Sequence, residues 1–262
     1  MSFTPMLALH IPDGFLSAPV ALSGWAIMVV LVGLALRQTR DTLGDRQIPL
    51  MGILAAFVFA AQMINFPVAG GTSGHLLGGM LVAVLLGPWA GVLVMTSVVM
   101  VQGLMFQDGG LLAMGFNVFN MGIITIFVGY AVFTWLSRIL GDSARGRMFG
   151  AAIGAWLGVE VAAIATALQL AISGTSPLTV ALPAMIGIHA LIGIGEALIT
   201  VGALSFISQT RPDLIGQKDH PAQGSSWIAA GLVIVLFVVL LSPLASSSPD
   251  GLEQVAVENG FI

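Results

Sequence analysis

The sequence predicts an all-α polytopic membrane protein, a helical bundle of about eight transmembrane helices with both termini outside. The first observation is composition: 57% of the 262 residues are hydrophobic and 8% are charged, against roughly 25% charged in an ordinary globular domain. A water-soluble fold of this composition would expose large apolar patches. The other two observations are the length of the apolar runs and the placement of the basic residues.

Eight apolar runs are long enough to cross a bilayer, which takes about 20 residues per helix. They lie near residues 19–36, 49–66, 71–88, 90–106, 111–137, 148–172, 183–208 and 226–245. The third and fourth runs are separated only by the very short turn Gly87-Pro88-Trp89. The third run begins in a stretch rich in glycine, which predicts irregular backbone. Within a membrane, such backbone is tolerated only where it packs inside protein or lines a cavity.

The basic residues lie in only three of the loops, those after the first, fifth and seventh runs. They are Arg37, Arg40, Arg46, Arg138, Arg145, Arg147, Arg211 and Lys218. With eight spans these loops share one side of the membrane, and the positive-inside rule makes that side the cytoplasm. The same count places both termini outside. We therefore expect a multi-pass protein of the prokaryotic cell (cytoplasmic) membrane.

Several functions are excluded by residues that the chain lacks. It has no cysteine, so disulfides, thiolate metal sites and cysteine nucleophiles are ruled out. It has one lysine and no phosphate-binding loop of the type G-x-x-x-x-G-K-[ST], so we expect any ATP hydrolysis to occur in another subunit. The sequence pI is about 5.4, which argues against nucleic acid as a partner.

Two acids, Glu160 and Glu196, lie inside predicted spans, and His189 precedes Glu196 by seven residues. Ionisable groups within a membrane are candidates for function. These residues could form a buried hydrogen bond with a structural role, or a proton relay in an ion-coupled secondary transporter. Gly150, Gly154 and Gly158 form a stripe at intervals of four residues, which favours close packing of helices inside the bundle over a face that docks a partner.

Two polar segments carry the chemistry. The first is the amino-terminal run from Leu9 to Leu16, which contains His10 in a turn-rich stretch. The second is the glycine-rich run 70–79, which contains His75. Both histidines are predicted at the outer mouth of the bundle. Histidine is the commonest metal ligand, so the pair indicates a metal site, with two solvated side chains as the alternative.

These segments resemble the CbiM/NikM family, the substrate-binding (S) components of energy-coupling-factor transporters for cobalt and nickel. The resemblance rests on His10-Ile11-Pro12-Asp13-Gly14-Phe15-Leu16 and Gly71-Thr72-Ser73-Gly74-His75-Leu76-Leu77-Gly78-Gly79, and it extends to about residue 208. The tail Pro249-Asp250-Gly251-Leu252-Glu253 resembles the PDGLE segment of the small NikN/CbiN-type component. The chain thus resembles a fusion: a substrate-binding domain at 1–208, a cytoplasmic linker at 209–225, and a helix with an external tail at 226–262.

The resemblance implies a chelate of nitrogen atoms around Ni(II) or Co(II). The implied ligands are His10, through its backbone amide and ring, His75, and the amine of Leu9 if the mature chain starts there. Nitrogen donors suit these metals better than Mg or Ca, which prefer oxygen. Asp13, Thr72 and Ser73 are weaker expectations as residues that orient the rings. No cofactor beyond the transported metal is implied, and the implied partners are a transmembrane T component and ABC-type ATPase subunits.

The sequence departs from the family pattern at its start, because eight residues precede Leu9. The run Met1 to Ala8 is too short for a signal peptide and lacks the basic start of one. Cleavage after Ala8 would free the Leu9 amine. Translation from a TTG codon at Leu9 would instead give a chain that begins Met-His-Ile-Pro-Asp-Gly, and this is the alternative we favour.

The sequence leaves two other function classes as alternatives. An ion-coupled secondary transporter would use Glu160 and Glu196 as a proton relay, but such folds often carry inverted repeats and the sequence has no convincing one. An intramembrane enzyme would use histidine and glutamate as acid and base. The chain has no serine or cysteine nucleophile motif and no H-E-x-x-H, so we expect a transport subunit and not an enzyme.

Overall fold

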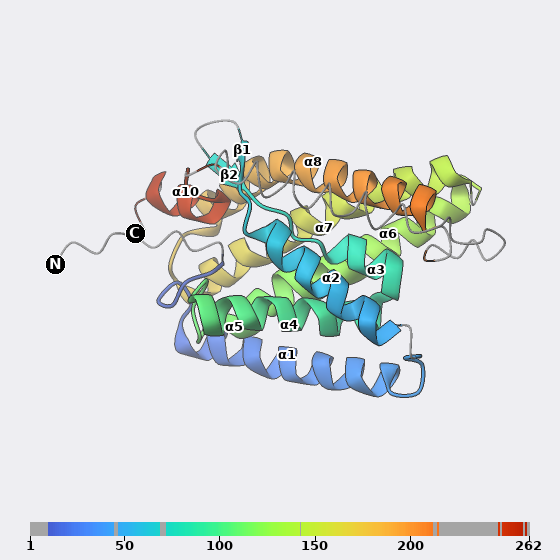
Figure 1. The fold of residues 1–262 in the computed structure, drawn as a ribbon. Helices are drawn as coiled ribbons and strands as arrows, with labels where there is room; N and C mark the ends of the chain where they lie inside the picture. Colours follow the sequence, from blue (N-terminus) through green and yellow to red (C-terminus); the bar gives the residue numbers. More distant parts are fainter. Residues whose placement is uncertain are drawn as a thin grey trace.

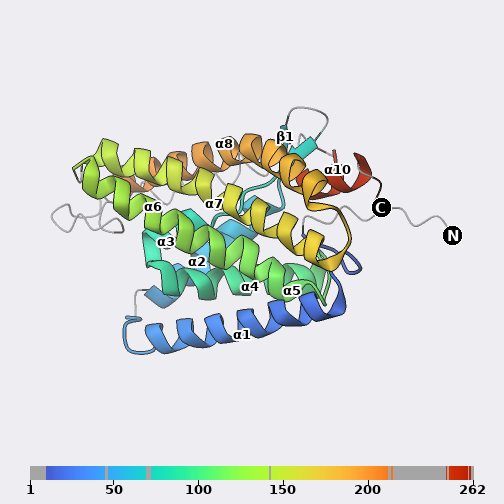
Figure 2. The same cartoon turned by 180° about the vertical axis from the view of Figure 1, so that it is seen from behind.

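In the computed structural model, the described residues are 10–44, 47–68, 72–141, 143–211, 214, 246, 248–258 and 260. They form a bundle of long helices that run beside one another, with a small hairpin and a short helix at one end (Figures 1 and 2). The elements in chain order are α1 (Ala18–Thr39), α2 (Gln47–Gln62), β1 (Phe66–Val68), β2 (Thr72–Gly74), α3 (Gly79–Leu86), α4 (Pro88–Phe106), α5 (Met114–Asn117), the π-helix η2 (Val118–Ile124), α6 (Thr125–Ile139), α7 (Ala144–Ser173), α8 (Leu178–Thr210) and α10 (Gly251–Glu258).

Five helical stretches among the described residues are long and apolar enough to cross a membrane. They are Ala18–Thr39, Pro88–Phe106, Met114–Ile139, Ala144–Ser173 and Leu178–Thr210. The helix α2 is apolar but has only 16 residues. The predicted run 226–245 lies outside the described residues. The chain is therefore a multi-pass membrane protein in which five of the eight predicted spans are long apolar helices.

The predicted span at 71–88 is not one helix, and this part of the prediction was wrong. The chain first forms β2, which pairs antiparallel with β1, and continues without helix through residues 75–78. Only then does α3 begin, and it has eight residues. Gly78 has a positive φ of 82°, which side-chain-bearing residues rarely adopt. Hydropathy alone predicted a helix because these buried residues are apolar, whatever their backbone conformation.

The glycine stripe of α7 packs inside the bundle against α6. A methyl group on Gly154 would lie 2.5 Å from the carbonyl oxygen of Gly129, and one on Gly158 would lie 3.1 Å from that of Thr125. The two backbones therefore approach closely, as small residues permit between helices in lipid. This outcome confirms the packing role of the stripe that the sequence favoured.

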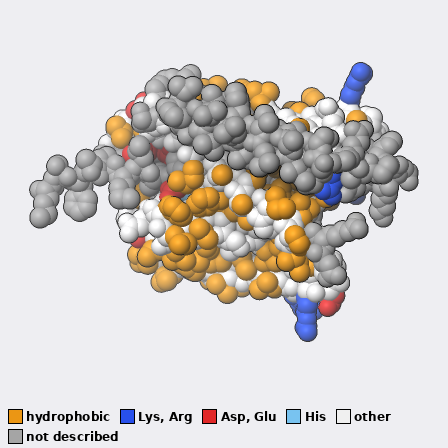
Figure 3. Space-filling model, in the orientation of Figure 1, with side chains coloured by type: hydrophobic (Ala, Val, Ile, Leu, Met, Phe, Trp, Pro, Cys, Tyr) orange, Lys and Arg blue, Asp and Glu red, His pale blue; other side chains and the backbone are white. Residues whose placement is uncertain are grey.

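The outer surface of the bundle is apolar along its flank and charged at one end. Figure 3 shows hydrophobic side chains along the visible flank and Lys and Arg side chains at the end away from α10. Large apolar residues of α1 are exposed, among them Leu22, Val29 and Val30. Such a flank suits contact with lipid tails, and the basic end agrees with the predicted sidedness of the loops.

Candidate functional site

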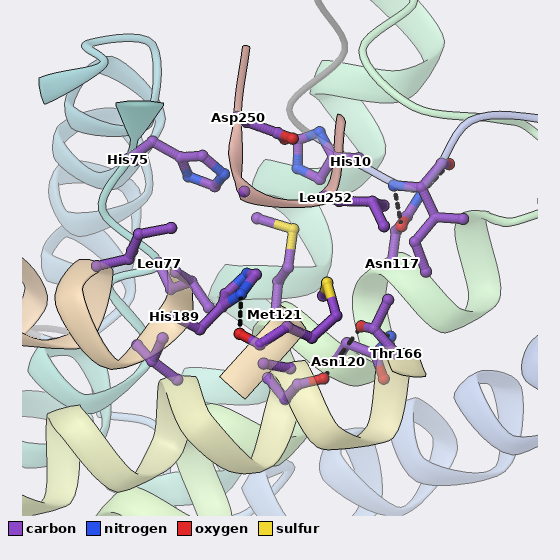
Figure 4. Close-up of a pocket in the computed structure, with 18 residues that line it drawn as sticks. His10, His75, Leu77, Asn117, Asn120, Met121, Thr166, His189, Asp250 and Leu252 are labelled. Atoms are coloured by element: carbon purple, nitrogen blue, oxygen red, sulfur yellow. Dashed lines mark hydrogen bonds between the residues drawn. The ribbon is translucent and has the colours of Figure 1, made fainter. Parts of the chain in front are cut away.

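A cavity of about 80 Å³ lies inside the end of the bundle where α10 sits. Its wall includes three histidines, His10, His75 and His189, which come from the amino-terminal segment, the stretch after β2, and α8. Figure 4 shows these rings around one space, with Asn120 and Met121 of η2 nearby. The predicted outer pair therefore shares a cavity with a third ring from within the bundle.

His10 is held in place by contacts to its ring and to the next residue. Its ring nitrogen Nδ1 lies 2.9 Å from Oδ1 of Asp108. The N–H of Ile11 donates to Asn117 Oδ1 at 3.0 Å, and Asn117 Nδ2 donates to the Ile11 carbonyl at 3.1 Å. The other ring nitrogen of His10, Nε2, is buried and has no hydrogen-bond partner among the described residues. Buried polar atoms without a partner are uncommon in proteins, so this nitrogen is a candidate metal ligand.

Gly109 is required beside His10. Its φ is +95°, and a methyl group there would lie 2.6 Å from the Cβ atom of His10 and 2.9 Å from Asn117 Nδ2. The Asp-Gly-Gly stretch of residues 108–110 therefore brings its acid against the His10 ring because the glycines leave room for the amino-terminal segment.

His10 and His75 face each other across 65 positions of sequence. Their ring centroids lie 6.2 Å apart with an interplanar angle of 44°. Two imidazoles bound to one metal ion at about 2.1 Å per bond have centroids at most about 6.5 Å apart. The observed separation fits one ion that lies nearly in line between the two rings. If the nitrogen–metal–nitrogen angle is bent, the two ring centroids must come about 1 Å closer.

His75 lies in a segment that is tied to two helices. Its Nδ1 lies 3.0 Å from the Leu76 carbonyl oxygen. The N–H groups of Leu77 and Gly78 donate to the two carboxylate oxygens of Glu196 at 2.6 and 2.9 Å. The amide of Gln62 in α2 donates to the Leu77 carbonyl at 2.7 Å. The irregular backbone predicted around His75 is therefore packed inside the protein, with its polar groups paired.

His189 and Glu160 are the other ionisable groups within the spans. His189 Nδ1 lies 2.8 Å from the Met185 carbonyl oxygen of its own helix, and its ring lines the cavity. Oxygen Oε1 of Glu160, in α7, is buried with no hydrogen-bond partner among the described residues. No group of three His, Asp or Glu side chains in the described part of the chain stands together as a metal site.

The three weaker candidates lie close to the site but contact other groups. Asp13 accepts the N–H groups of Leu111, Leu112 and Ala113, and so ties the amino-terminal segment to the start of α5. Thr72 pairs with Val68 in the hairpin. Ser73 binds the carboxyl-terminal segment, as described next. Leu9, the remaining candidate ligand, lies outside the described residues.

The PDGLE-like tail lies directly over the cavity. The N–H of Ser73 donates to the Pro249 carbonyl at 2.8 Å, and its hydroxyl donates to that of Ser248 at 2.7 Å. Asp250, Gly251 and Leu252 then form part of the cavity wall. A methyl group on Gly251 would lie 2.9 Å from Cε1 of His189. The tail therefore packs against the third ring and forms part of the wall of the site.

Asp250 directly precedes α10 and is buried next to the histidine pair (Figure 4). Its Oδ1 accepts the N–H of Glu253 at 2.7 Å, which caps the helix. Burial raises the pKa of Asp250 to about 6, against the opposing effects of that hydrogen bond and of His75. The sequence assigned no role to Asp250, Asp108 or Asn117, although Asp108 and Asn117 lie within the region over which the family resemblance extends and Asp250 lies in the tail motif.

Comparisons with known proteins agree on one class. Residues 10–214 match the family model described as the cobalt uptake substrate-specific transmembrane region, CbiM. The chain is 40% identical over 257 residues to a protein of Archaeoglobus fulgidus named as a candidate fused nickel transport protein NikMN, covering 97% of this chain and 83% of that one. It is 34% identical to the cobalt transport protein CbiM of Sorangium cellulosum, over 79% of this chain and 94% of the relative.

A solved structure has the same fold. The crystal structure of a truncated transition metal transporter aligns with a TM-score of 0.69 and 35% sequence identity. The alignment covers 76% of this chain and 98% of the other. The shared region is therefore nearly the whole of that transporter.

Proposed function

This chain belongs to the CbiM family of cobalt uptake transmembrane proteins, and from that premise we propose that it is the S component of an energy-coupling-factor transporter that captures Ni(II) or Co(II) at the outer face of the cell membrane. Relatives named as nickel and cobalt transport proteins support the substrate class. A fused NikMN-type relative supports reading the tail as an accessory segment.

The observation that carries the proposal is the pair of buried imidazoles with centroids 6.2 Å apart. His10 and His75 supply ring nitrogens to one ion. The backbone amide of His10 and the amine of Leu9 complete a nitrogen set in a mature chain that begins at Leu9, and intact-mass measurement of the native protein tests that start. Nitrogen donors bind Ni(II) and Co(II) in preference to Mg or Ca.

Delivery inward requires partners, because the chain has no phosphate-binding loop for ATP. We place it beside a transmembrane T component that is driven by ABC-type ATPases. Release follows when the ligand set opens or its nitrogens take up protons, since metal binds only the deprotonated form. The tail, seated over the cavity through Ser73, has the role of loading or opening the site.

Metal titration of the purified protein tests the proposal. Wild-type protein should bind Ni(II) or Co(II) at one ion per chain, and His10→Ala and His75→Ala should each abolish binding while the bundle remains folded. His220→Ala is the matched control, because that histidine lies in the predicted cytoplasmic linker, and it should bind as wild type. Stoichiometric binding by His75→Ala would refute the assignment.

A further inference from the structure

Glu196 contacts the peptide unit that also faces the His75 ring. The peptide between Leu76 and Leu77 has its carbonyl oxygen 3.0 Å from His75 Nδ1. The N–H of the same peptide donates to Oε2 of Glu196 at 2.6 Å. One rigid amide plane therefore joins the carboxylate to the imidazole, because a peptide unit does not twist about its C–N bond.

The reason for a carboxylate at this position lies in the start of α3. The first N–H groups of a helix have no partner within it, and the residue that precedes α3, Gly78, has no side chain to cap it. Oxygen Oε1 of Glu196 accepts the Gly78 N–H at 2.9 Å. Glu196 itself is 1% exposed, so water does not supply these acceptors. A negative charge also suits a helix N-terminus.

The next peptide unit, between Leu77 and Gly78, is held at both of its polar groups, because its N–H donates to Glu196 and its carbonyl accepts from Gln62. Gln62, which is 0% exposed, donates from α2 to the Leu77 carbonyl at 2.7 Å. The segment after His75 is thus bound between α2 and α8. Turning the Leu76–Leu77 peptide would break buried hydrogen bonds, each of which costs about 1–3 kcal/mol when left unpaired.

On the basis of the proposed metal site, we propose that Glu196 is a positioning residue for metal capture: through the Leu76–Leu77 peptide it holds the His75 ring with its proton on Nδ1 and its lone pair on Nε2. A hydrogen bond to an ionised acceptor is stronger than a neutral one, and it polarises the amide so that its carbonyl becomes a better acceptor. Metal-binding histidines commonly donate their second N–H to a carboxylate or a carbonyl. Here the His75 ring contacts the Leu76 carbonyl, and the N–H of the same peptide unit donates to the Glu196 carboxylate.

Glu196→Gln tests this role because glutamine has one acceptor oxygen, and its NH₂ group would face an N–H donor. The affinity of the purified full-length protein for Ni(II) or Co(II) should fall about 10- to 100-fold, as for other residues that orient a metal ligand. Glu160→Gln is the matched control, the same exchange at a buried acid of α7, and its affinity should equal that of wild type. Wild-type affinity in Glu196→Gln would overturn the role.

A second measurement does not depend on metal. Nitrogen NMR of metal-free protein labelled with ¹⁵N-histidine reports which ring nitrogen carries the proton, and His75→Ala identifies the resonance. We expect the proton on Nδ1 in wild type and a mixture of both forms in Glu196→Gln. A proton on Nε2 in wild type overturns the inference, even if Glu196→Gln fails to fold. If wild type binds no metal, the proposed function fails, and the NMR result still decides the role of Glu196.

Discussion

Each of the three rings around the cavity has its Nδ1 against an oxygen atom. The acceptor is a carboxylate for His10 and a backbone carbonyl for His75 and His189. A neutral imidazole with its proton on Nδ1 carries its lone pair on Nε2. The arrangement therefore prepares Nε2 as the binding atom of His75 and His189, whereas a chelate that includes the His10 backbone amide uses His10 Nδ1, the atom that Asp108 contacts in this structure.

Asn117 holds His10 through the backbone of its neighbour, and its removal should affect both stability and metal binding. Asn117→Ala would leave the buried N–H of Ile11 unpaired, at about 1–3 kcal/mol. The Ile11 carbonyl would lose one of two hydrogen bonds, because it also accepts the Gly110 N–H at 2.9 Å. We expect a lower midpoint of thermal unfolding in detergent and about 10- to 100-fold weaker Ni(II) binding. Asn117→Asp keeps the acceptor and loses only the donor, so its loss should be smaller. Equal affinity in wild type and Asn117→Ala would contradict this account.

At the scale of residues, the sequence predicted the two histidines that meet but not the groups that hold them. His10 and His75 stand out because they are polar residues in glycine-rich turns beside apolar runs. Asn117 does not stand out, and Glu196 stands out only as an acid inside a predicted span, because the partners of these two residues lie 106 and 119 residues away. Such hydrogen bonds depend on how helices pack, which one sequence does not reveal.

At the scale of elements, hydropathy located the long helices and the glycine-rich stretch predicted the irregular backbone near His75, but neither pattern predicted the strand or the π-helix. The stretch 72–78 is a strand followed by irregular backbone, and η2 is a π-helix between α5 and α6. A π-helical segment inside an α-helix is uncommon and often lies at a functional site. Here it contributes Asn120 to the cavity wall, and the amide groups of Asn120 and Gln169 donate to each other at 2.8 Å.

Because α6 packs closely on α7, adding even one methyl group at Gly154 should destabilise the protein. A methyl group there meets backbone and not a flexible side chain, so Gly154→Ala must push the helices apart, at a cost of about 1–3 kcal/mol. In α8, Gly202 has nothing within 4 Å of the same position. Gly202→Ala should keep or raise stability because alanine favours helix. Thermal unfolding in detergent compares the two, and equal midpoints would contradict the close packing.

At the scale of the whole molecule, the chemistry and the basic residues occupy opposite ends. The cavity lies at the end that carries α10, whereas the visible Lys and Arg side chains lie at the other (Figures 1 and 3). The placement of the bases in three loops predicted this polarity from sequence. The closure of the cavity by the tail was not predictable, because the hydrogen bonds of Ser73 join residues 175 and 176 positions apart.

Removal of the tail should impair transport more than folding. A chain that lacks residues 246–262 loses the tail contacts to Ser73 and the wall formed by Asp250 to Leu252, but keeps the long helices. We expect reduced uptake of radioactive nickel or cobalt by cells, with the protein still present in the membrane. Ser73→Ala removes only the hydroxyl contact and should give a smaller loss. Full uptake by the truncated chain would rule out a loading role.

The seat of α10 beside β2 has a consequence for stoichiometry. Because the tail and the cavity belong to one polypeptide, their meeting is a unimolecular event, governed by an effective concentration and not by the concentration of the protein. Diluting the protein leaves unchanged the fraction of molecules in which the tail contacts the cavity. Each chain has one tail and one cavity. If the tail were a separate protein, the fraction of cavities that bind it would instead depend on its level of expression and on its dissociation constant.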